Sequence, residues 1–200
     1  MVLSFALALV TAQQVAWVPA GRGPGALRWY TREKAGSAVR ELRATSLLPL
    51  PPALVWEVLT DFEGYVQTLP GTVEAKVLRS DEVSADVYLR YVLPLISARD
   101  TVVQMRAEAD PARGRWQLSW SSTENRDAPT PPGDTVRLAR NVGSWRLSSR
   151  EDGKATFVEY ELHSPPGGGV PPFIVNQVKG RGVPETFAAL ERAARLRSRD

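Results

Sequence analysis

The side chains that most often carry out catalysis are sparse in this sequence. His163 is the only histidine among the 200 residues, and there is no cysteine. A nucleophile or a general base needs a positioned partner, and no serine stands in a Gly-x-Ser-x-Gly pattern. We therefore interpret His163 as a hydrogen-bonded wall residue. We predict no catalytic site, no metal site and no bound cofactor.

The other polar patterns are typical of structural roles. Glu159 and Glu161 are two residues apart on an expected strand, so they share one face, which we interpret as solvated. No dinucleotide-binding or Walker motif occurs, so nothing predicts a phosphate cradle. The glycines at 167–169 are flanked by prolines. They indicate either a hinge or a sharp turn into a helix.

Three tryptophans are the strongest candidates for an apolar binding surface. Trp116 and Trp120 are four residues apart on one expected strand and so share its face, and Trp145 lies on a later strand. Each such side chain buries about 150–250 Å² when it is enclosed. The spacing alone leaves two interpretations open, namely ordinary core packing and the wall of a cavity.

The segments that would position these residues follow two hydrophobic periods. Between 39 and 162, apolar and polar residues alternate in short runs separated by turn signals, which predicts antiparallel strands. Pro51 and Pro52 open a helix. After Pro172, apolar residues recur at helical spacing to the end of the chain. We predict one α+β domain with a strongly curved sheet, whose concave face is crossed by the C-terminal helix.

Four segments resemble the START domains, the lipid-transfer relatives of the steroidogenic acute regulatory protein. They are LPLPPALVWEVLTDFEGY (48–65), LPLISARDTVVQMR (93–106), VGSWRL (142–147) and PPGGGVPPFIVNQVKGRGVPETFAALERAA (165–194). The matches fall in the family's order. One departure is that Ser164-Pro165-Pro166-Gly167-Gly168 stands where many members carry Asp-Pro-Gly-Gly. The resemblance implies a helix-grip fold with an internal hydrophobic tunnel.

The resemblance also implies which residues would meet a ligand. Some sterol-binding members hold an acidic–basic pair in the tunnel, and Asp86 and Arg106 lie near those positions. Strand alternation by itself instead places both residues on a solvent face, and a one-residue register slip would reverse this. We expect Arg99 and Asp100 to form a structural turn pair. The further candidate ligand contacts are Tyr88, Trp120, Trp145, His163, Ile174 and Val178.

The functional prediction is a protein that binds a lipid or sterol-like molecule, and transfers it, without converting it chemically. Two alternatives stay open. An aromatase/cyclase-type enzyme of the same superfamily would act on a polyketide-like substrate, but it needs positioned acid and base groups. A module with a filled core would bind a protein or a membrane surface through an exposed apolar patch. Transient contact with a membrane surface also fits the first prediction.

Charge and the N-terminus suggest where such a protein works. The net charge is +3, and lysines and arginines are scattered among acids, so no nucleic-acid partner is expected. Residues 1–12, MVLSFALALVTA, are apolar and have the length of a signal-peptide core. We predict that they are removed, that residues 13–200 form the mature domain, and that this bacterial protein is exported to the periplasm or beyond. The alternatives are a capping N-terminal helix and a cytoplasmic location.

Overall fold

The computed structural model describes residues 15–92, 94 and 96–199, and the side chains of 172–181 are not among the described parts. The predicted signal peptide, residues 1–12, therefore lies outside the described residues. The predicted ligand contacts Ile174 and Val178 lie outside the described side chains. Within the described ranges, no helix is long and apolar enough to cross a membrane.

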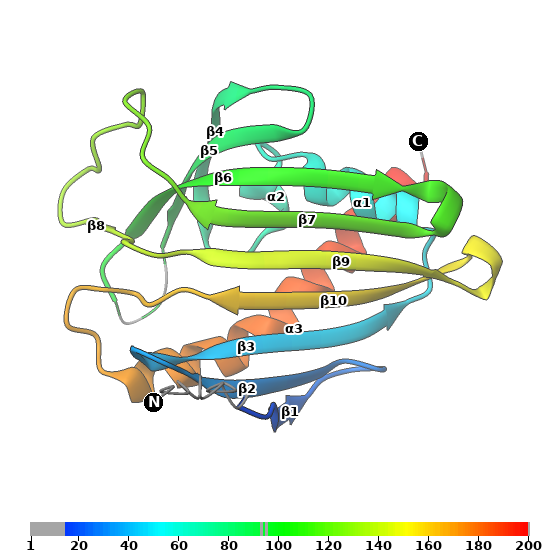
Figure 1. Ribbon diagram of the computed structural model, residues 1–200, viewed down its shortest axis with the longest axis horizontal. Coiled ribbons are helices and arrows are strands. Elements are labelled where there is room, and N and C mark those ends of the chain that lie inside the picture. Colours follow the sequence, from blue (N-terminus) through cyan, green and yellow to red (C-terminus); the bar gives the residue numbers. More distant parts are fainter. Residues whose placement is uncertain (1–14, 93, 95, 200) are drawn as a thin grey trace, which may run out of the picture.

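A single curved sheet forms one layer of the molecule (Figure 1). Its strands are β1 (Val18–Arg22), β2 (Arg28–Lys34), β3 (Ser37–Leu48), β4 (Thr72–Ser80), β5 (Ser84–Tyr91), β6 (Arg99–Asp110), β7 (Arg115–Ser122), β8 (Val136–Arg137), β9 (Val142–Arg150) and β10 (Ala155–His163). They are ordered β1-β2-β3-β10-β9-β7-β6-β5-β4, with antiparallel neighbours throughout. Short β8 pairs in parallel with the start of β6.

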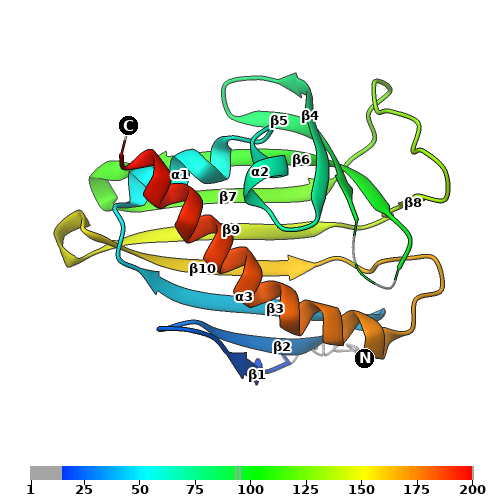
Figure 2. The same ribbon diagram turned by 180° about the vertical axis from the view of Figure 1, so that it is seen from behind.

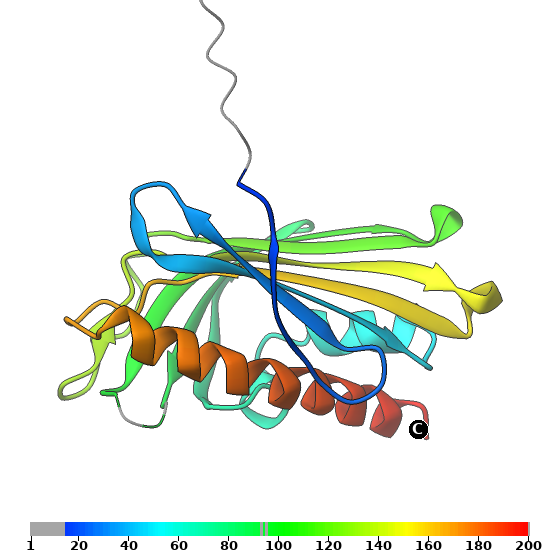
Figure 3. The same ribbon diagram turned by 90° about the horizontal axis from the view of Figure 1, so that it is seen from below.

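Three helices cover the concave face of this sheet. They are α1 (Pro52–Thr60), α2 (Tyr65–Thr68) and α3 (Pro172–Arg197). Figure 2 shows α3 running diagonally across the sheet, and Figure 3 shows the sheet and α3 as two layers. Both α1 and α3 begin with proline, which is tolerated where no intrahelical N–H bond is needed. The predicted α+β helix-grip architecture is confirmed.

The hydrophobic core lies between the sheet, α1 and the C-terminal half of α3. Val183, Phe187, Leu190 and Ala194 recur at helical spacing on α3 and are buried, because together they form one apolar stripe. They join α1 side chains and the concave-face residues of β5, β6, β7 and β9 in one cluster. Arg197, at the end of α3, forms an ion pair with Asp61 after α1. These contacts fix the far end of α3 against the domain.

The convex face carries charge. Glu159 and Glu161 of β10 both form ion pairs with Arg43 of β3 and Arg146 of β9, so the interpretation of these carboxylates as a solvated face holds. Arg43 also lies over the ring of Trp17, at 4.6 Å from its centroid. Because these charged rows stay on the convex face, the more apolar side of the sheet faces the helices. The site therefore has to be sought on the concave face.

Candidate functional site: a pocket between the sheet and the C-terminal helix

A pocket of about 240 Å³ lies on the concave face, at the end of the domain away from α1. Its walls come from α2, β4, β5, β6, β7, β9, β10 and α3 and from four connecting segments, 69–71, 96–98, 138–141 and 164–171. The lining residues are Tyr65, Leu69, Pro70, Thr72, Leu89, Tyr91, Ile96, Arg99, Met105, Trp120, Leu138, Asn141, Trp145, Tyr160, Leu162, Ser164, Pro166, Val170 and Thr186. Most of them are apolar or aromatic, as is typical of small-molecule sites.

An aromatic wall closes one side of the pocket. Trp145 and Tyr160 stack with ring centroids 4.1 Å apart and planes at 25°. Trp120 stacks on the other side of Tyr160 at 6.2 Å, and Phe187 of α3 packs on Trp145 at 5.6 Å. The four rings come from β7, β9, β10 and α3. They form a continuous apolar surface that links the sheet to the helix.

Gly143 makes this wall possible. It lies opposite Trp120 in the pairing of β7 with β9. A Cβ atom at this position would lie 2.3 Å from Cζ2 of Trp120 and 2.5 Å from the Glu161 carbonyl oxygen, closer than van der Waals contact allows. The glycine therefore lets the indole lie flat over the backbone. The sequence Gly143-Ser144-Trp145 therefore combines a close backbone approach with an aromatic side chain of the wall.

The phenols of the pocket are held in their neutral form. Burial raises the pKa of Tyr65, Tyr91 and Tyr160 far above the ordinary value. The Tyr65 hydroxyl donates to the Leu59 carbonyl oxygen at 2.5 Å, so its proton is already engaged. Near neutral pH these groups act as hydrogen-bonding groups rather than as acids or bases that exchange protons.

The polar groups of the pocket gather where β4, β5 and β6 lie side by side. Thr72 is opposite Tyr91, and Tyr91 is opposite Arg99 in the strand register. Nearby, Asn141 accepts a hydrogen bond from Nε1 of Trp120 at 3.1 Å through its side-chain oxygen. Thr72 is 5% exposed, and its hydroxyl has no hydrogen-bond partner in the part of the chain that the structure describes.

Arg99 supplies the charge of the pocket. Its Nε donates to the Pro166 carbonyl oxygen at 2.8 Å, and its Nη1 donates to the Ser97 carbonyl oxygen. The side chain thereby ties the 164–171 segment to β6. Burial lowers the pKa of Arg99, although the charge of Asp134 acts in the opposite direction. Arginine nevertheless stays protonated in proteins.

Four of the residues predicted as ligand contacts lie outside the pocket, and these placements are corrections. Asp86, Tyr88 and Arg106 point to the convex side because side chains alternate along β5 and β6, and the register places Asp86 opposite Gln104 rather than beside Arg106. Asp86 accepts from Nδ2 of Asn125 at 2.9 Å. His163 lies one position beyond the lining residue Leu162, and its Nε2 is 3.1 Å from the Ser37 hydroxyl.

Trp120 and Trp145, two further residues predicted as ligand contacts, line the pocket. Their role in binding stays a prediction. Sequence reasoning missed Arg99, Thr72, Asn141 and Met105. The alternation of Leu89 with Tyr91 was a usable signal for Tyr91. No such signal marked Arg99. Thr101, Val102 and Val103, which follow it on β6, are buried on both faces of the sheet, so no alternation shows which face Arg99 takes.

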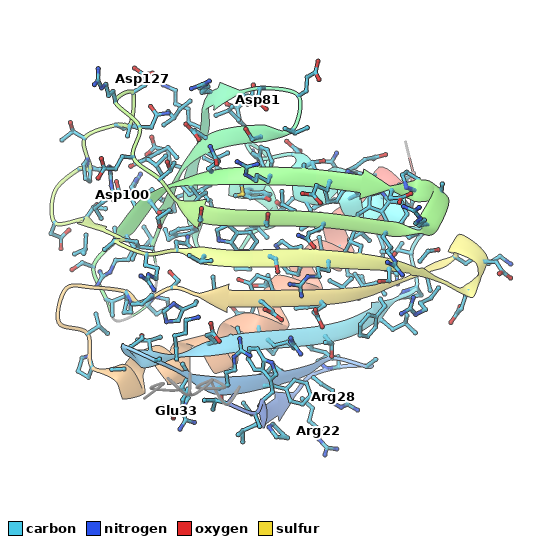
Figure 4. The ribbon with its side chains drawn as sticks, in the orientation of Figure 1. Arg22, Arg28, Glu33, Asp81, Asp100 and Asp127 are labelled. Atoms are coloured by element: carbon cyan, nitrogen blue, oxygen red, sulfur yellow. The ribbon has the colours of Figure 1, made fainter. Side chains whose placement is uncertain are left out.

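The expected turn pair of Arg99 and Asp100 is also corrected. Both residues belong to β6, and Asp100 faces the convex side, where the 123–141 segment covers it (Figure 4). Arg137 of β8 donates to Asp100 through Nε at 2.8 Å and through Nη2 at 2.7 Å. This bidentate pair neutralises Asp100 away from the pocket. Tyr88 is buried beside it, and the burial raises the Tyr88 pKa to about 12.

Comparison with known proteins agrees with this geometry. The family model described as "Polyketide cyclase / dehydrase and lipid transport" matches residues 48–191, most of the chain. The chain belongs to this family. In the described part of this family member, no group of three or more histidine, cysteine, aspartate or glutamate side chains is placed to hold a metal ion.

Solved structures place the family member among START-like domains. A STAR-related lipid transfer protein from Xanthomonas axonopodis is 28% identical, with a TM-score of 0.73, and the match covers 92% of this chain and 99% of that one. Human StAR-related lipid transfer protein 5 is 17% identical, with a TM-score of 0.81 over 90% and 86% of the chains. The Zhui aromatase/cyclase from Streptomyces sp. R1128 is 21% identical, with a TM-score of 0.51 over 78% and 90%.

Proposed function

We propose that this protein binds one lipid or other hydrophobic small molecule in the pocket and transfers it without converting it. The observation that carries the proposal is the composition of the pocket: an aromatic wall, aliphatic side chains, and phenols whose pKa values are raised by burial. Burying apolar ligand surface there contributes about 25 cal/mol per Å². The lipid-transfer description of the family and of the Xanthomonas protein supports it.

An aromatase/cyclase activity is the second candidate, because the family description includes polyketide cyclases and the Streptomyces enzyme shares the fold. Such an enzyme needs a proton donor and an acceptor next to its substrate. Arg99 is the one charged residue among the described lining residues, and it exchanges no proton near neutral pH. The residues of this pocket therefore favour binding over conversion.

We also propose that transfer involves transient contact with a membrane and takes place outside the cytoplasm. Val66 of α2 and Val92 after β5 are exposed next to segments that line the pocket, and each presents an apolar side chain to solvent. Trp17 lies between the guanidinium groups of Arg32 and Arg43, at 4.3 and 4.6 Å. These contacts hold Trp17, which follows the proposed cleavage after Ala12, against β2 and β3. N-terminal sequencing of the native protein tests this, and an intact Met1 contradicts it.

The binding proposal is tested by native mass spectrometry of the purified protein, followed by solvent extraction and identification of the released compound. We expect one hydrophobic molecule per chain, recovered chemically unchanged. Recovery of a modified product together with its precursor would instead support the cyclase. A protein that carries no such molecule, and takes none up from a lipid extract, would contradict the proposal.

A further inference from the structure

We propose that the pocket selects an amphiphile with a carboxylate head group, which Arg99 and Thr72 bind while the apolar body lies along the aromatic wall. The inference rests on the proposed function and narrows its ligand class. Four observations carry it: a buried arginine without an ion-pair partner, a free edge of its guanidinium group, an unpartnered hydroxyl on a neighbouring strand, and an apolar surface beyond them.

The first observation is that Arg99 lacks an ion-pair partner, since Asp134 acts on it only from beyond contact distance. Arg99 is 3% exposed, and in the described part of the chain no carboxylate lies within ion-pair distance of it. Its neighbour Asp100 is engaged by Arg137 on the opposite face. A buried cation without a partner is costly. A ligand anion would supply the ion-pair partner that Arg99 lacks.

The second observation concerns the free donors. Hydrogen bonds from Nε and Nη1 of Arg99 go to backbone carbonyls, and Nη2 has no acceptor among the described residues. Gly168 packs next to this nitrogen, and a Cβ atom there would crowd it at 3.2 Å from Nη2. Guanidinium groups bind planar carboxylates through strong charge-assisted hydrogen bonds. The Nη2 edge is therefore available for this interaction.

The third observation is the hydroxyl of Thr72. It is fully buried, lines the pocket and lacks a partner in the described part of the chain. Thr72, Tyr91 and Arg99 occupy paired positions on three adjacent strands, so about 10 Å separates the backbones of Thr72 and Arg99 on either side of Tyr91. A buried hydroxyl without a partner is destabilising. A carboxylate at this row would accept hydrogen bonds from the threonine and from the arginine.

The fourth observation is the apolar lining of the rest of the pocket, which selects the body of the ligand. The aromatic wall and the side chains of Leu89, Met105 and Leu162 offer no further charge. An amphiphile with one anionic end and an apolar body therefore matches the pocket, whereas an uncharged sterol or a cationic amphiphile leaves Arg99 without a partner. Decanoate, 1-decanol and decylamine differ in the head group alone and serve as probes.

The test measures the dissociation constants of these probes at about pH 7 by isothermal titration calorimetry, for the full protein and for three variants. Arg99→Gln removes the charge, Arg99→Lys keeps it, and Arg106→Gln removes a charge from the convex face of the same strand. We expect the parent to bind decanoate roughly tenfold more tightly than 1-decanol. This preference should vanish in Arg99→Gln, survive in Arg99→Lys and be unchanged in Arg106→Gln.

Thr72→Val provides a variant that keeps Arg99 and its contact with Pro166. It should unfold at the same or a higher urea concentration than the parent and bind decanoate about fivefold more weakly. Equal binding of decanoate and 1-decanol by the parent would overturn the inference and leave the proposed binding function intact. If the parent binds none of the probes and no other hydrophobic molecule, both the proposed function and this inference are overturned.

Discussion

Arg99 and Asp100 are adjacent in sequence, yet their side chains lie on opposite faces of β6. Asp100 is buried on the convex side and accepts two hydrogen bonds from Arg137, at 2.8 and 2.7 Å. Arg99 lines the pocket on the concave side. The carboxylate that would most readily neutralise Arg99 is thus committed elsewhere. This separation gives the pocket its positive end.

Breaking the pair on the convex side should destabilise the fold. Arg137→Met leaves the Asp100 carboxylate buried without its partner, which we expect to lower the free energy of unfolding by about 3 kcal/mol. Urea denaturation measures the change. Arg113→Met is the control, because Arg113 pairs with Asp110 at an exposed turn and such pairs contribute little. Equal, small losses in both variants would contradict the structural role of the Asp100–Arg137 pair.

Gly143→Ala should damage the aromatic wall. The added methyl group would overlap the Trp120 ring and the Glu161 carbonyl, so we expect a loss of about 1–3 kcal/mol in stability and weaker ligand binding. Gly182→Ala in α3 is the matched control, because its methyl group would meet no atom within 4 Å and alanine favours helix. Gly182→Ala should therefore be neutral or stabilising. Similar losses in the two variants would contradict this account of Gly143.

In the segment that precedes α3, alanine should be less well tolerated at Gly168 than at Gly169. Gly168 and Gly169 have φ values of +62° and +70°, a region that alanine enters at a cost of about 1–2 kcal/mol. At Gly168 the added Cβ also presses on Arg99, whereas at Gly169 it meets nothing within 4 Å. We expect Gly168→Ala to be the less stable variant in thermal unfolding. The reverse order would mean that Arg99 does not pack against this segment.

Transfer between membranes should depend on the exposed apolar side chains near the pocket. Val92→Glu places a charge directly after β5, next to the pocket-lining residue Tyr91. It should slow vesicle-to-vesicle transfer of a fluorescent lipid several-fold while leaving equilibrium binding unchanged, because charged groups partition poorly into lipid. Val83→Glu, in the turn between β4 and β5, is the control, since Val83 is also exposed but lies at the end of β5 opposite to the pocket-lining residue Tyr91. Equal transfer rates in both variants would remove Val92 from the membrane contact.

The sequence predicted the architecture because its periodicities are strong. Alternation in the central strands and the apolar stripe of Val183, Phe187 and Leu190 specify a sheet with a covering helix. Two segments deviated. Residues 18–22 form β1 although Pro19 and Gly21 indicate a loop, because the Gly21 backbone lies against the ring of Trp29 on β2. The helix α2 (Tyr65–Thr68) has four residues, too few to show a helical period in the sequence.

The site was predicted in part. Trp120 and Trp145 could be predicted from the sequence, because large aromatic side chains on the concave face of a sheet line any site on that face. Asp86 and Arg106 were misplaced by analogy, although their own alternation already pointed to the convex face. Arg99 could not be found, because its position depends on the strand register and on the long-range bond to Pro166, 67 residues away. Tertiary contacts of this kind leave no local pattern.

The measurement that tests the central claim most directly is decanoate binding by Met105→Trp, read together with the stability of the variant. Met105 lines the pocket, so the indole should occupy ligand space, abolishing binding while the free energy of unfolding changes by less than about 1 kcal/mol. Gln104→Trp, one residue away on the other face, should bind as the parent does. Unchanged decanoate binding by Met105→Trp would contradict a ligand pocket between the sheet and α3. A decrease of about 1–3 kcal/mol in its free energy of unfolding, typical of an overpacked core, would contradict it as well.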